Sequence, residues 1–257
     1  MKTQNLVFGL MLAVLLALPL VLAQEPMLIS ANDNQNINAT LPNPGITPDN
    51  PVWAIKRVIE RIDLFLTFDK SIHAEKGLNY TRVRLAEVTA MIAENRLDAA
   101  NKSKNDYEQQ MIEVENDIKD INDTNSTKEL EKVIALEGEI NLNRMYVERL
   151  NESILVKTKG NITAEQQTAI ESVIATLSNS TDRAKIEIND KKDSVKVLIK
   201  AEGNLTDAQV SAIESAINAT LVARGQSGIY MTTPNPTANE QNKTGHQNIT
   251  NENESIS

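Results

Sequence analysis

The chain has 257 residues, with 35 acidic and 26 basic side chains, a formal net charge of −9, no cysteine and only eight aromatic residues. The lack of cysteine excludes disulfide scaffolds, cysteine nucleophiles and cysteine-ligated zinc or iron–sulfur sites. The acidic balance argues against nucleic acid as a partner, because such binding begins with cationic contacts to phosphates.

Residues 1–23 have the layout of a secretory signal peptide. Lys2 supplies a positive charge, an apolar run covers 6–18, and Pro19 precedes the modest side chains that end at Ala23. We expect cleavage after Ala23, which places the mature protein outside the cell or on its surface. The alternative is a retained anchor, since 6–23 is just long enough to span a bilayer. In that case the membrane is contacted only through this segment.

Asparagine occurs repeatedly as the acceptor of N-glycosylation sequons. The chain has 28 asparagines and thirteen N-x-[ST] sequons, against roughly four expected by chance from its composition. An exported chain with this pattern is typical of a heavily N-glycosylated surface protein. The acceptors are Asn38, Asn79, Asn101, Asn122, Asn125, Asn151, Asn161, Asn179, Asn204, Asn218, Asn242, Asn248 and Asn253.

Residues 24–47 are rich in Asn, Pro, Gln and Thr and predict a disordered leader. An antiparallel helical bundle is expected over 48–152, with a first helix that opens at Asn50 as N-cap and Pro51 as first helical residue. Asp69 is expected to cap the second helix. Apolar residues recur at spacings of three and four and predict buried stripes on four helices. The stripes are Val52, Ile55, Ile59, Ile62 and Leu66; Leu78, Leu85, Val88 and Ile92; Tyr107, Met111, Val114, Ile118 and Ile121; and Val133, Leu136, Ile140, Val147, Leu150 and Ile154.

Two features of these stripes leave alternatives open. Asn143 lies on the fourth seam, where a polar residue either fixes the register or is tolerated. Trp53, Phe65 and Phe68 cluster on the first helix and at its end. We interpret them as anchors of that helix to the core, because buried aromatics dominate small cores. The alternative is a patch that binds a partner.

A repeat follows in the region 153–233. Residues 157–166 recur at 200–209, and each copy carries a capping box, Thr163 with Gln166 and Thr206 with Gln209. The flanking apolar residues show a period of two, at Ile186 and Ile188, at Val195, Val197 and Ile199, and at Ile229 and Met231. With 190–193 as the central turn, this period predicts a βαββαβ, ferredoxin-like domain and an α+β fold overall. In the all-α alternative, 181–200 continues as helix and buries one face. That face would contain Leu177, Ala184, Ile188, Val195 and Leu198.

The rest of the chain offers little chemistry. Residues 234–257 are Asn- and Thr-rich and predict a disordered tail. The only histidines, His73 and His246, have no partner of catalytic or metal-ligating spacing, and no phosphate-binding loop or nucleophile motif is present. We therefore expect no catalytic residue, no metal site and no cofactor.

The run from Pro48 to Glu60, PDNPVWAIKRVIE, resembles the opening motif of the family called domain of unknown function 5667, found in exported proteins of archaea and bacteria. The runs 66–69 (LTFD) and 84–87 (RLAE) continue the likeness over about 46–150. The resemblance implies an exported helical domain without an established activity. Its motif positions fall on Trp53, Lys56, Arg57 and Glu60, for which a structural role suffices, since Lys56 and Glu60 form an i, i+4 pair.

A second, shorter likeness suggests a different function. The run 205–209, LTDAQ, is similar to the L-T-x-x-Q motif of periplasmic stress chaperones. The sequence therefore predicts an exported, non-catalytic structural or interaction protein with a protein or cell-envelope partner. The alternative is an envelope chaperone or stress-sensing protein that binds unfolded clients. The oligomeric state is not predicted.

Overall fold

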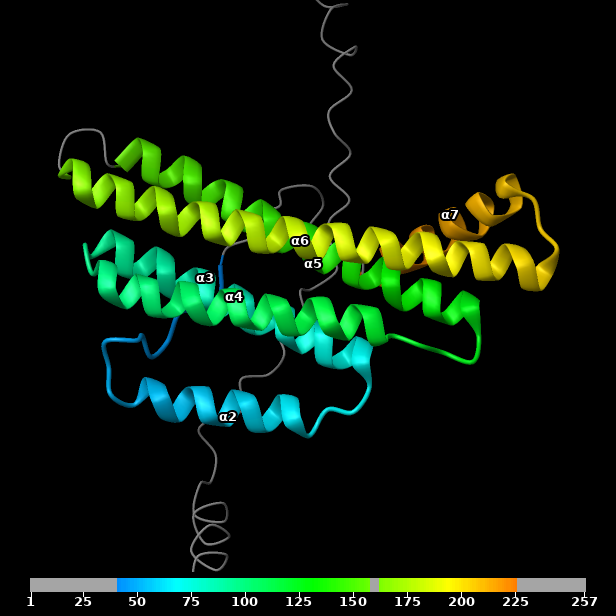
Figure 1. Cartoon of the computed structure of the whole chain (residues 1–257), viewed down its shortest axis with the longest axis horizontal. Helices are drawn as coiled ribbons and strands as arrows, with labels where there is room; N and C mark the ends of the chain where they lie inside the picture. Colours follow the sequence, from blue (N-terminus) through cyan, green and yellow to red (C-terminus); the bar gives the residue numbers. More distant parts are fainter. Residues whose placement is uncertain (1–40, 158–161, 226–257) are drawn as a thin grey trace, which may run out of the picture. The chain divides into compact units, whose positions relative to one another are not determined.

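The computed structural model describes residues 41–157 and 162–225, all within one compact unit, and every regular element in these ranges is a helix. The expected signal over 1–23, most of the leader and the expected tail over 234–257 lie outside the described residues. Figure 1 shows the helices in chain order: α2 (Trp53–Phe65), α3 (Lys70–Ala93), α4 (Leu97–Asp120), α5 (Ser126–Lys157), α6 (Ala164–Gly203) and α7 (Asp207–Ala223).

Four of these helices form a closed bundle. Helix α3 packs on α4, α4 on α6, α6 on α5, and α5 back on α3. Short connections between successive helices make them antiparallel, as in other helical bundles. Helix α2 packs on α3 outside this ring, and in Figure 1 α3 and α4 separate it from α5 and α6. Among the described helices none has both the length and the apolar character that crossing a bilayer demands.

The apolar stripes predicted for the second, third and fourth helices are confirmed, because all their members are buried. They build the bundle core from aliphatic side chains and Tyr107, whose hydroxyl lies 2.6 Å from Thr181 Oγ1 of α6. A second cluster joins α5, α6 and α7 at the other end of α6. Its buried members are Leu130, Ile134, Val195, Ile199, Val210, Ile217 and Leu221.

Side-chain caps set the starts of α3, α6 and α7, whereas α2 has no side-chain cap and begins at Trp53, later than the predicted start at Asn50 and Pro51. Asp69 is the N-cap of α3, as predicted, and accepts hydrogen bonds from the backbone N–H groups of Ser71 and Ile72. Helix α3 ends in a Schellman motif, in which Asn95 takes a left-handed conformation (φ 58°) and Arg96 N–H donates to Met91 O. Both predicted capping boxes are present, at the starts of α6 and α7.

The predicted α+β fold is wrong, and the protein is all-α over its described residues. The segment read as helix, strand, turn and strand is one continuous helix, α6, of 40 residues. The period of two was a coincidence of helical positions: Ile188, Val195 and Ile199 are buried, while Ile186 and Val197 are more than 60% exposed. The region 190–193, read as a turn, contains no glycine or proline and continues the helix. The strand expected near 229–231 lies outside the described residues.

The all-α alternative identified most of the buried face of α6. Leu177, Ala184, Ile188 and Val195 are buried, but Leu198 is 48% exposed and its neighbour Ile199 takes the core position. The repeat therefore encodes two capped helix starts. Both of its copies contain a capping box, at Thr163 for α6 and at Thr206 for α7.

Polar contacts and one close approach fix how the bundle helices meet. Asn143 of α5 is fully buried and donates from Nδ2 to Thr81 Oγ1 of α3, at 2.7 Å. This contact supports the interpretation that Asn143 fixes the register of α5 against α3, because a shift of one residue along α5 would leave its amide unpaired. Between α3 and α4, a Cβ added at Gly77 would lie 2.7 Å from Val114 Cγ2, so the helices approach too closely for any larger residue.

An ion-pair cluster joins α5 to α6. Glu137 accepts hydrogen bonds from Lys185 Nζ and Lys192 Nζ, both at 2.6 Å. Burial by itself raises the pKa of Glu137, but the two ammonium groups outweigh burial and hold that pKa below its usual value of 4.5. The carboxylate therefore stabilises the folded bundle while it is ionised.

Candidate functional site

Helix α2 is inverted relative to an ordinary surface helix. The stripe predicted to face the core is turned outward: Val52, Ile55, Ile62 and Leu66 are exposed, and Ile59 is half-buried. The expectation that this stripe is buried is therefore wrong. The residues that face inward are instead the four positions of the family motif, Trp53, Lys56, Arg57 and Glu60, together with the buried Leu64.

Helical geometry explains why the two sets separate cleanly. At 100° per residue, positions 53, 56, 57 and 60 share one face, and positions 52, 55, 58, 62, 65 and 66 share the opposite face. We call the second set, together with Phe68 just beyond the helix, the α2 outer face. Phe65 is 80% exposed and Phe68 is 87% exposed. The aromatic cluster is thus divided, with Trp53 inside and both phenylalanines outside.

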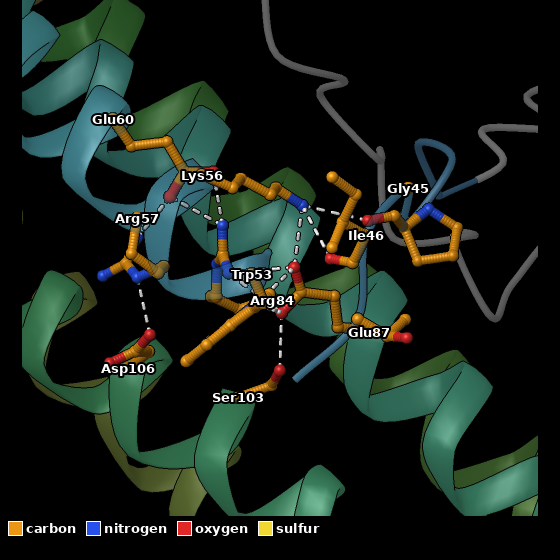
Figure 2. A network of polar contacts seen from close by, with 12 residues as sticks. Gly45, Ile46, Trp53, Lys56, Arg57, Glu60, Arg84, Glu87, Ser103 and Asp106 are labelled. Atoms are coloured by element: carbon orange, nitrogen blue, oxygen red, sulfur yellow. Dashed lines mark hydrogen bonds and ion pairs between the residues drawn. The ribbon is translucent and has the colours of Figure 1, made fainter. Parts of the chain in front are cut away.

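Glu87 of α3 is the centre of the contacts that hold α2 (Figure 2). Its carboxylate pairs with Lys56 Nζ at 2.8 Å and with Arg84 Nη1, 2.9 Å from each oxygen. Ser103 Oγ of α4 donates to it at 2.5 Å, and Trp53 Nε1 lies 3.3 Å from both oxygens. Three helices therefore converge on one fully buried carboxylate.

A second carboxylate extends the network along α2. Glu60 accepts from Arg84 Nη2, with 2.5 and 2.7 Å to its two oxygens, and from Arg57 Nη1. Arg57 Nε lies 2.6 Å from Asp106 Oδ2 of α4, an ion pair whose geometry is not that of a hydrogen bond. Figure 2 shows Arg84 between the two glutamates, and its guanidinium carbon lies 5.8 Å from the centroid of the Trp53 ring, a cation–π distance.

Lys56 also fixes the chain before α2. Its ammonium donates to Pro44 O at 3.0 Å and to Ile46 O at 3.4 Å. Gly45 lies between these carbonyls at φ +61°, a conformation that a side chain would strain, and an added Cβ would lie 3.9 Å from the ammonium nitrogen. The turn at 44–46 therefore wraps the end of the lysine side chain.

Three cations and three anions balance within the network. Lys56, Arg57 and Arg84 each face at least one of Glu60, Glu87 and Asp106. A charge that is already paired and hydrogen-bonded is a poor general acid or base, since proton transfer would break the compensation. What the arrangement does is hold an amphipathic helix by its polar face and leave its apolar face free.

Sequence reasoning found part of this network. The i, i+4 pairing of Lys56 with Glu60 does not describe the contacts, because Lys56 pairs with Glu87 and Glu60 pairs with two arginines. The RLAE run at 84–87, part of the family likeness, contains the two α3 members of the network, Arg84 and Glu87. Ser103 and Asp106 of α4 were missed, and their spacing of three residues, one helical turn, is too common to single them out.

His73 contacts a different carboxylate. Its Nδ1 lies against Asp117 Oδ2, and Lys70 Nζ pairs with the other oxygen of Asp117 at 2.9 Å. Over 41–157 and 162–225 no group of three or more His, Cys, Asp or Glu side chains could hold a metal ion. His246 lies outside these ranges.

The described sequon asparagines all lie at the surface. Six are exposed and two, Asn101 and Asn218, are half-buried. The exposed ones are Asn79, Asn122, Asn125, Asn151, Asn179 and Asn204. Asn38, Asn161, Asn242, Asn248 and Asn253 lie outside the described residues. No sequon falls between Asn38 and Asn79, the interval that contains all of α2.

The fold and the network define an all-α protein in which ion pairs hold an inverted amphipathic helix on the outside of a four-helix bundle. The chain belongs to the family described as Domain of unknown function (DUF5667), whose model matches residues 45–256. The resemblance seen over about 46–150 is therefore confirmed, and the match extends across α6 and α7. No curated protein and no solved structure matches the chain.

Proposed function

We propose that this protein is an exported, N-glycosylated, non-catalytic interaction protein of the cell surface, and that it binds its partner through the α2 outer face. The observation that carries the proposal is the inversion of α2. Six charged side chains, contributed by α2, α3 and α4, hold the helix in place while seven large apolar side chains are left in water.

The size of this face supports a binding role. Taking about 150–250 Å² for a fully exposed residue of these types, the exposed fractions of the seven side chains amount to roughly 800 Å². The largest apolar patch on a typical monomer is about 300–600 Å², and larger ones mark interaction sites. A structural role in the bundle would bury this surface, which the observed orientation of α2 does not do.

The location and the glycosylation rest on the sequence. The signal layout of 1–23 supports export, and the surface position of the eight described sequons is what a glycosyltransferase requires. The absence of sequons between Asn38 and Asn79 supports a binding role for the α2 outer face, because a glycan attached to α2 would cover that face.

The test uses the tagged full-length protein in its native host. The proposal expects the protein in the envelope or medium with added glycan mass, and in a native extract at a size above that of the single chain. Ile55→Asp should lower that size, since it places a charge in the α2 outer face. Cytosolic, unglycosylated protein, or an Ile55→Asp variant of unchanged native size, would refute the proposal.

An envelope chaperone is the second candidate, favoured by the two phenylalanines that the α2 outer face presents at 80% and 87% exposure. Exposed apolar side chains of this kind suit unfolded clients. An aggregation-suppression assay discriminates between the two. A chaperone protects a client at substoichiometric concentration and loses this activity on Phe65→Ser, whereas an interaction module with a dedicated partner does not protect.

A further inference from the structure

We propose that the partner of the α2 outer face is a second copy of this chain, so that the protein is a two-fold symmetric dimer with α2 packed against α2. This inference rests on the proposed function of the face and names its partner. It is carried by three properties of the face: its area, its charge and its sequence spacing.

The area agrees with that of a specific interface. A stable protein–protein interface buries about 800 Å² on each partner, and the α2 outer face offers roughly that much apolar surface. In a two-fold dimer the same patch contributes from both sides. Complete burial of the face would therefore give an interface of the standard size.

The region around the face is electrically neutral by its formal charges. The chain as a whole has a net charge of −9, but residues 41–72 carry four acidic and four basic side chains. Four of these eight charged groups, Lys56, Arg57, Glu60 and Asp63, make ion pairs within the network or with Lys76, so they point away from the outer face. Two copies can approach through this region with little of the repulsion that the rest of the surface would produce.

The spacing suits a helix as the opposing surface. Val52, Ile55, Ile59, Ile62 and Leu66 follow the three–four alternation of a two-helix seam, and Val58 and Phe65 widen it on one side. A membrane is less suited, because interfacial helices carry lysine and arginine on the polar face. Here Lys56 and Arg57 are paired with Glu87 and Asp106.

The experiment measures the mass of the purified full-length protein by sedimentation velocity between about 1 and about 100 µM, the range of ordinary reversible dimers. We expect twice the mass of the single glycosylated chain. Ile55→Asp and Ile62→Asp should raise the dissociation constant at least about 100-fold, since each buries two uncompensated carboxylates. Both residues are exposed in the single chain, so the far-UV circular dichroism and the melting temperature of the monomer should stay unchanged.

Matched controls come from α6. Ile186→Asp and Val197→Asp alter apolar side chains that are more exposed than Ile55 and Ile62, at 62% and 66%, and should change the dissociation constant less than about threefold. The absence of cysteine permits a second test. Ile59→Cys lies at the centre of the seam from Val52 to Leu66, so it should form a disulfide between copies whether the helices pair parallel or antiparallel, while Val197→Cys should not.

A monomer at every concentration would overturn the inference, and so would a dimer that persists in Ile55→Asp or dissociates in Ile186→Asp. Binding of the monomer to lipid vesicles, neutral or anionic, would assign the face to a membrane and also overturn it. These failures are separate from failure of the proposed function. A purified monomer that still forms an Ile55-dependent assembly in the native extract would keep the function and replace the second copy by another protein.

Discussion

Replacing Glu87 by glutamine tests whether the buried charges hold α2 in place. Glu87→Gln preserves the shape and one acceptor oxygen but removes the negative charge that faces Lys56 and Arg84. Removing one partner of a buried ion pair costs about 3–5 kcal/mol, and the retained acceptor places this variant near 3 kcal/mol. For a domain of this size that loss lowers the melting temperature by about 6 to 12 °C.

Trp53, the only tryptophan of the chain, allows the loss of stability in Glu87→Gln to be measured at the site itself. Trp53 lies against Glu87 and Arg84, so its emission reports whether α2 is docked, while far-UV circular dichroism reports the whole bundle. In Glu87→Gln we expect the tryptophan transition in urea to move to lower concentration than the circular dichroism transition. In the wild type the two should coincide.

A surface ion pair provides the matched control. Glu148→Gln removes the partner of Arg144, an i, i+4 pair with more than half of each side chain exposed, and should cost less than about 0.5 kcal/mol. If Glu87→Gln cost no more than this control, or left the tryptophan transition unchanged, the network would not be what holds α2.

Three further predictions concern the bundle. Thr81→Val removes the acceptor of the buried Asn143 amide and should cost about 1–3 kcal/mol in urea unfolding. Gly77→Ala places a Cβ 2.7 Å from Val114 Cγ2 and should cost about 1–3 kcal/mol, most of it recovered when Val114 is also made alanine. Glu137, whose pKa is lowered by its two lysines, contributes stability that is complete above its unfolded pKa of 4.5. That contribution is lost as the pH falls through the lower folded pKa, so Glu137→Gln should flatten the loss of melting temperature below pH 4.5.

Each of these predictions has an outcome that contradicts it. Wild-type stability in Thr81→Val would mean that the Asn143 amide finds another acceptor. A Gly77→Ala variant that Val114→Ala does not relieve would place the strain elsewhere. An unchanged pH profile in Glu137→Gln would mean that its carboxylate is not differentially stabilised in the folded state.

The sequence predicted the parts of the fold that depend on local rules. Caps at Asp69, Thr163 and Thr206 are determined by side chains reaching N–H groups within three residues, so they could be read directly. The stripes of α3, α4 and α5 are long and strictly periodic. The strands predicted within α6 failed because two or three alternating residues are too few to separate a period of two from a helix.

The orientation of α2 could not be read from periodicity alone. An amphipathic pattern shows that a helix has an apolar and a polar face, but which face meets the bundle depends on what α3 and α4 present to it. They present Arg84, Glu87, Ser103 and Asp106, residues far along the chain whose charges match those of α2. The default that apolar faces turn inward therefore gave the wrong result at the candidate site.

The two faces of α2 respond in opposite ways to ionic strength. Added salt weakens the pair between Lys56, whose side chain is 21% exposed, and the buried Glu87 only in part, because buried pairs are screened less than exposed ones. Salts that are excluded from protein surfaces strengthen apolar contacts at the same time, so whatever covers the outer face holds it more firmly. The salinity of the surrounding solution would thus shift the balance between the attachment of α2 to its own bundle and apolar contact at its outer face.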